Sequence, residues 1–96
     1  RRHIHMTSLF QLGRIVITPD ALDHLNLLGI RPERLLDRHV AGDWGDLSPI
    51  DRMTNLEALM SGDRLMSAYM VGASVKIWII TEASREVTTI LCPENY

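Results

Sequence analysis

The apolar residues of this chain change their spacing at Gly62, and this change restricts the possible folds more than any other feature. Before Gly62 they recur every three or four residues, as in helices with one buried side. After it they form three short runs rich in β-branched residues, 64–71, 75–81 and 86–92. Short polar connections join the runs, so they predict an antiparallel meander. Apolar residues on both faces of the middle run indicate a central strand.

The part before Gly62 predicts a strand followed by three short helices. The β-branched run 13–18 is the expected strand. Thr18 and Ser48 are expected to cap the first and third helices, because each precedes a proline that suits the first helical position. The second helix is expected to begin near Pro32. The apolar stripe of the third helix consists of Met53, Leu56, Leu59 and Met60.

Together these patterns predict an α+β domain with an N-terminal strand, three short helices and a three-stranded antiparallel meander on which the helices pack. The first six residues, RRHIHM, are interpreted as the remnant of a histidine tag, which leaves 7–96 as one globular domain. Cys92 is the only cysteine, a pattern that favours a reducing, cytoplasmic setting. The sequence has no apolar run of the roughly 20 residues that a membrane span needs.

Charge and motifs narrow the function classes. Ten basic residues, two of them Arg1 and Arg2, stand against 12 acidic ones. This balance argues against direct binding to nucleic acid, and it favours a basic protein partner, for example one that handles nucleic acid. The sequence contains no glycine-rich phosphate loop, no H-E-x-x-H and no C-x-x-C, so it predicts no cofactor. A homodimer through an exposed strand such as 86–92 is an open possibility.

The stretch 38–51, RHVAGDWGDLSPID, holds the candidate site residues. His39 lies at the edge of an apolar stripe, where it can be a general base or a half-buried structural imidazole bonded to its own helix end or the following loop. Trp44 is interpreted as an anchor of the loop on the core, with a stacking platform for a base as the alternative. The predicted binding residues are His39, Asp43, Trp44 and Asp46.

The carboxylates of this stretch do not predict a metal site. Asp43, Asp46 and Asp51 lack the alternating ligands of a calcium loop, and Asp51 is explained by the start of the third helix. Asp43 and Asp46 are therefore left without an assigned structural role.

Four ordered motifs link the chain to a known family: HVAGDWGDL, NLEAL, GDRLMSAY and KIWIITEASREVTTILCPENY. Through them the chain, from Phe10 to Tyr96, resembles a family of small bacterial proteins labelled plasmid-related. Some members are labelled as modification subunits of type I restriction enzymes. The resemblance implies a small bacterial protein with one domain, and it implies no particular activity.

A second resemblance concerns architecture. Helices that end in RHVAGDWG and precede an antiparallel meander are similar to metal-independent ribonucleases of the barnase and colicin D type. RNA cleavage of that kind needs a base, an acid and a cation for the phosphate. The candidate residues for these roles are His39, Arg38, Lys76, Arg85 and Thr88.

Two functional hypotheses follow from the sequence. The first is a non-catalytic protein-interaction or regulatory module whose surface combines the acidic loop 43–51 with an edge of the sheet. The alternative is the metal-independent ribonuclease.

Overall fold

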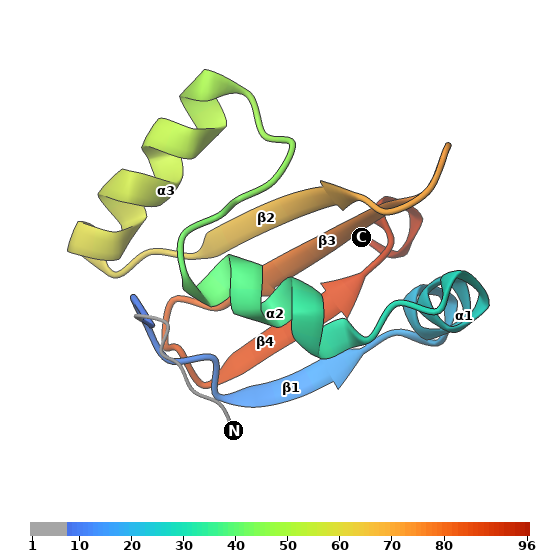
Figure 1. Ribbon diagram of the computed structural model, residues 1–96. Coiled ribbons are helices and arrows are strands. Elements are labelled where there is room, and N and C mark those ends of the chain that lie inside the picture. Colours follow the sequence, from blue (N-terminus) through green and yellow to red (C-terminus); the bar gives the residue numbers. More distant parts are fainter. Residues whose placement is uncertain (1–7) are drawn as a thin grey trace.

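In the described residues, 8–96, the computed structural model contains one strand, three helices and three further strands (Figure 1). Their bounds are β1 Arg14–Ile17, α1 Pro19–Leu28, α2 Pro32–Val40, α3 Pro49–Ser61, β2 Leu65–Met70, β3 Lys76–Thr81 and β4 Val87–Leu91, with a short 3₁₀ helix, η1, at Pro93–Asn95. The predicted order of strand, helices and strands is confirmed. The interpretation of residues 1–6 as a tag lies outside the described residues.

The four strands form one mixed sheet in the order β1-β4-β3-β2. β2, β3 and β4 make the expected antiparallel meander, with β3 in the interior. β1 joins the sheet parallel to β4, so the prediction of a three-stranded antiparallel sheet is wrong, while the α+β class is confirmed. The extra strand is held by long-range bonds, such as Arg14 N to Glu86 O at 2.8 Å. Because β4 has a neighbour on each side, it offers no free edge for dimerisation.

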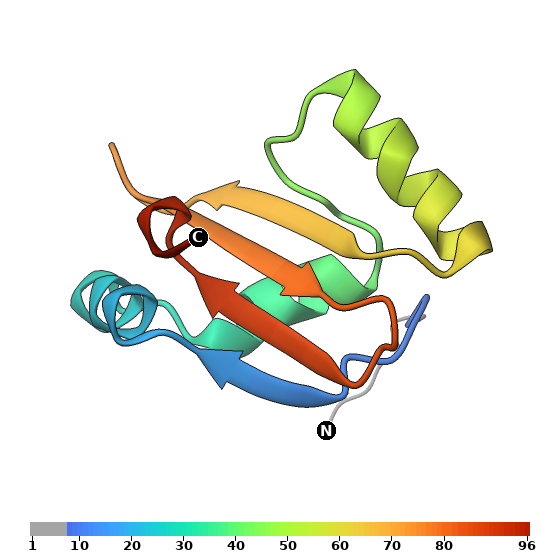
Figure 2. The same cartoon turned by 180° about the vertical axis from the view of Figure 1, so that it is seen from behind.

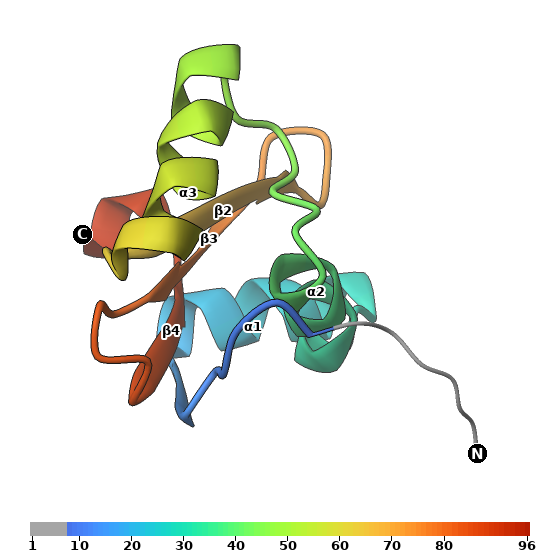
Figure 3. The ribbon, with the colours of Figure 1, turned by 90° about the vertical axis from the view of Figure 1, so that its left-hand side faces the viewer.

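α1 and α2 cover one face of the sheet, and α3 lies beside the edge strand β2 (Figures 1 and 3). Figure 2 shows the opposite face, on which η1 lies. Among residues 8–96, no helix combines the length and the apolar character needed to cross a membrane. The main core lies between the sheet and the first two helices and consists of Ala21, Leu25, Leu35, Leu36, Tyr69, Ile77, Ile79, Ile90 and Cys92.

Helix caps act as the sequence predicts. The Thr18 hydroxyl accepts a hydrogen bond from Ala21 N at 3.3 Å, and the Ser48 hydroxyl accepts one from Asp51 N at 3.1 Å. Both helices therefore begin with a satisfied backbone N–H and with proline at the first position. These caps fix where α1 and α3 start.

The orientation of α3 differs from the expectation. Asn55 and Ala58 are buried, whereas three of the four residues in the predicted apolar stripe are exposed. The amide of Asn55 makes two bonds with the backbone of Met66 on β2, Nδ2 to O at 2.6 Å and Oδ1 from N at 3.1 Å. This pairing turns the small and polar side of α3 toward the sheet, so the stripe of Met53, Leu56 and Met60 faces outward.

Candidate functional site

His39 lies in the core between α2 and the sheet, with none of its surface exposed. Its Nδ1 is 2.5 Å from Ser67 Oγ on β2, and its Nε2 is 2.9 Å from Thr81 Oγ1 on β3. The expectation of a half-buried imidazole bonded to its own helix end or to the loop is wrong. α2 directs the ring inward, so that its partners are strand hydroxyls instead.

The imidazole belongs to a chain of buried polar groups. Thr81 Oγ1 is 2.7 Å from Thr88 Oγ1, and Thr88 donates to Leu12 O at 2.6 Å. A hydroxyl has one proton, so Thr81 donates to Thr88 and accepts from Nε2–H of His39. The neutral ring then accepts at Nδ1 from Ser67. This sequence of donors and acceptors assigns the Nε2–H tautomer and leaves no member without a partner.

Burial lowers the pKa of His39 to about 4, so the ring is neutral at pH 7. Its ring edges contact two aromatic side chains, Phe10 at 5.1 Å and Trp44 at 5.8 Å between centroids. A general base must come within hydrogen-bond distance of a substrate proton. Both nitrogens of His39 are occupied and the ring has no solvent contact, so this arrangement is that of a structural histidine.

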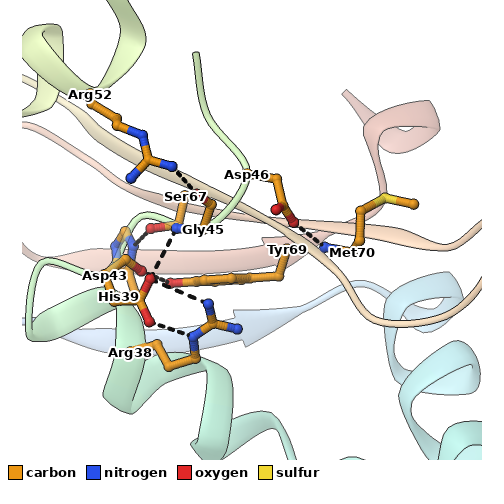
Figure 4. Close-up of polar contacts among 9 residues, drawn as sticks. All are labelled: Arg38, His39, Asp43, Gly45, Asp46, Arg52, Ser67, Tyr69 and Met70. Carbon is orange, nitrogen blue, oxygen red and sulfur yellow. Dashed lines mark hydrogen bonds and ion pairs between the residues drawn. The ribbon is translucent and has the colours of Figure 1, made fainter. Parts of the chain in front are cut away.

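Asp43 is held by Arg38 at the end of α2 (Figure 4). Its carboxylate accepts hydrogen bonds from Arg38 Nε at 2.7 Å, from Arg38 Nη2 at 3.2 Å and from Gly45 N at 3.3 Å. The hydrogen bond from Arg38 lowers the pKa of Asp43. The Arg38 guanidinium lies over the Tyr69 ring, 4.5 Å from its centroid. Asp43 therefore has a structural role that its sequence context does not reveal.

Asp46 and its neighbours close the outer edge of β2. The Asp46 carboxylate accepts from Met70 N at 2.8 Å, and Asp46 N donates to Ala68 O at 2.6 Å. Ala68 N donates to Trp44 O at 3.1 Å, so the loop forms a parallel bridge with β2. Asn55 bonds both backbone groups of Met66. The acidic loop thus occupies the β2 edge, and it does not form a joint surface with a free edge.

Two residues explain why the loop lies so close to the strand. The backbone of Gly45 has φ +75°, and a Cβ there would be 2.1 Å from Ala68 O. Only glycine fits this approach. The Trp44 ring is buried and stacks with Phe10 at 6.2 Å, which confirms its interpretation as a core anchor.

The five ribonuclease candidates do not share an accessible surface. His39 and Thr88 are joined through Thr81, but both are fully buried. Arg38 is engaged with Asp43, and Arg85 donates to backbone carbonyls at the C-terminal end of α3. Lys76 begins β3, at the end of the sheet opposite the turn that carries Arg85. The base, acid and cation of such a mechanism are not brought together.

The residues that sequence reasoning missed are the partners of His39. Thr88 was considered only as a ribonuclease candidate, and strand alternation places Thr81 on the same face as Ile77 and Ile79. That alternation was the available signal for Thr81. In the part of the chain that the structure describes, no group of three or more His, Cys, Asp or Glu side chains is placed to hold a metal ion.

Comparisons with protein-family models, with curated proteins and with solved structures found no significant match to this chain.

Proposed function

We propose that this chain is a non-catalytic protein-interaction module that binds through the outward side of α3. The observation that carries the proposal is the exposure of four large apolar side chains there: Ile50 is 77% exposed, Met53 59%, Leu56 52% and Met60 90%. We call these four residues the apolar face of α3. Single exposed apolar residues are common, but a continuous group on one helix is typical of a binding surface.

The acidic loop has a different place in this proposal. The Asp43 carboxylate is bound by Arg38 of α2 and that of Asp46 by the β2 backbone, so neither is free to form the centre of a recognition site. The loop leads directly into α3 at Ser48, next to Ile50. It therefore forms a charged border of the apolar face, where it would favour a partner with basic residues at the rim.

The ribonuclease alternative has less support. Its proposed base, His39, has no exposed surface, and both of its nitrogens are bonded. Purified protein is expected to leave a mixed-sequence RNA intact. Cleavage that His39→Gln abolishes would overturn the non-catalytic proposal.

Site-specific photocrosslinking in bacterial cells tests the binding surface. A photoreactive residue at Met60 is expected to give a discrete crosslinked protein that mass spectrometry can identify. The same residue at Leu27 is the matched control, because Leu27 is 86% exposed but lies on α1. The crosslink at Met60 should disappear when Leu56→Glu is added. Equal crosslinking at the two positions, or none at Met60, would refute the proposed surface.

A further inference from the structure

We infer that the apolar face of α3 binds a second copy of this chain, with the two α3 helices packed in parallel. This inference rests on the proposed function, since it names the partner of the same surface. Three features support a second copy: the spacing of the apolar residues, the charges beside them and the position of α3 in the fold.

The spacing is that of a two-helix seam. Met53, Leu56 and Met60 follow each other by three and then four residues, as the a and d positions of a coiled coil do. At about 100° per residue they fall within a sector of roughly 60°. Asn55 and Ala58, which contact the rest of the domain, lie on the opposite side of the helix. The seam therefore points away from the body of the molecule.

The charges beside the seam favour a parallel second copy. Arg52 and Glu57 flank the seam on opposite sides and are five residues apart, which matches the g and e positions of a heptad. In a parallel pair, Arg52 of one copy lies beside Glu57 of the other, and symmetry forms this contact twice. In an antiparallel pair, Arg52 lies on the same side as Arg52 of the other copy, and Glu57 on the same side as its equivalent, so like charges face each other. Arg52 already donates Nη2 to Gly45 O at 2.9 Å and Nε to Leu47 O at 3.2 Å, which holds its guanidinium at this flank.

The fold leaves room for this packing. α3 lies at the periphery of the described residues, and no other element of 8–96 covers its outer side (Figures 1 and 3). A two-fold axis along this side would place the two domains on opposite sides of the helix pair. α3 has 13 residues and is about 20 Å long. Its outer side therefore supplies only part of the roughly 800 Å² per partner that a standard interface buries.

An open groove adds to that area. It has a volume of about 490 Å³ and lies at the C-terminal end of α3, where Leu9, Phe10, Leu59 and Met60 contribute apolar lining. Met60 belongs both to the groove and to the apolar face. We therefore expect a reversible dimer whose contacts extend from the helix seam into this groove.

Sedimentation measurements over a concentration series test the inference on the whole chain. The wild type is expected to show a monomer–dimer equilibrium. Leu56→Glu should raise the dimer dissociation constant by roughly tenfold or more, because it places a charge in the seam. Leu27→Glu, the same change at an exposed leucine of α1, should leave it unchanged. A wild type that remains monomeric, or equal effects of the two changes, would overturn the second copy as partner.

Cysteine crosslinking tests the parallel arrangement. In a parallel pair each seam residue faces its own equivalent, so Met53→Cys alone and Met60→Cys alone should each form a disulfide-linked dimer. Crosslinking only when the two variants are mixed would overturn the parallel arrangement. A monomeric wild type whose position 60 crosslinks to a different protein would refute the second copy and leave the proposed function intact. No crosslink of either kind would refute both.

Discussion

The face of the sheet around His39 and the outer side of α3 have opposite distributions of polar and apolar residues. His39, Ser67, Thr81 and Thr88 are buried, yet each has a hydrogen-bond partner. On the outer side of α3, large apolar side chains are exposed and are not packed against other described residues as core side chains are. Residue type alone would have placed function at the histidine and core packing at the methionines.

The difference shows that the environment of a side chain, and not its residue type alone, decides whether its interactions are complete within the fold. A buried polar group that lacks a partner costs about 1–3 kcal/mol, so complete pairing around His39 is what stability requires. An exposed apolar group gains free energy only when another surface covers it. The polar region is therefore complete within one chain, whereas the apolar face of α3 is exposed and, under the proposed function, is covered by a partner.

The largest expected loss of stability is that of Gly45→Ala, in the loop that packs against β2. The new Cβ would overlap Ala68 O in a backbone with positive φ, so the free energy of unfolding should fall by about 3 kcal/mol or more. Gly62→Ala is the matched control: its φ is +83°, but no atom lies within 4 Å of the added Cβ. There we expect a loss of about 1 kcal/mol. Equal losses in urea denaturation would show that the loop is not held against β2.

Acid should lower the free energy of unfolding because of the buried imidazole of His39. The pKa of an unfolded histidine is near 6.5, and that of His39 in the folded protein is about 4. As the pH falls below 6.5 the unfolded state binds a proton first, so the free energy of unfolding decreases until about pH 4. The full loss is about 3 kcal/mol, and it is absent above pH 7.

The experiment compares the wild type with His39→Gln from pH 7 to pH 4. Glutamine can keep one of the hydrogen bonds but does not titrate, so the variant should be less stable at pH 7 and less dependent on pH. Ser67, Thr81, Phe10 and Trp44, the side chains around the ring, do not titrate in this range. His24→Gln, the same substitution on α1, is the matched control. An unchanged slope in His39→Gln would mean that the buried ring does not cause it.

Local features of the fold could be read from the sequence. Thr18 and Ser48 mark the helix starts because a cap involves only residues three positions away. The apolar residues on both faces of 75–81 identified an interior strand for a similar reason. The position of β1 could not be read, since its pairing with β4 joins residues more than 70 positions apart. Periodicity finds an amphipathic element but not the neighbour that it pairs with.

The same limit applies to the candidate site. Sequence placed His39 at the edge of an apolar stripe, but its partners are 28 and 42 residues away. The roles of Asp43 and Asp46 depend on contacts with Arg38 and with the β2 backbone, which no spacing rule specifies. On α3 the helical period was correct, whereas the choice of buried side was wrong because Asn55 pairs with the β2 edge.

The adjacent residues Leu59 and Met60 test whether the outer side of α3 is exposed in the monomer. The smallest effect on stability is expected at Met60. Leu59 packs against the cluster of Trp44, Ala58 and Leu65, whereas Met60 is 90% exposed. At concentrations where the chain is monomeric, Leu59→Glu should lower the free energy of unfolding by about 2 kcal/mol, because it brings a charge into the core. Met60→Glu should change it by less than about 0.5 kcal/mol, since no packing is lost. A comparable loss in both variants, measured by urea denaturation, would show that α3 buries its apolar face in the monomer and would remove the contrast between the two regions.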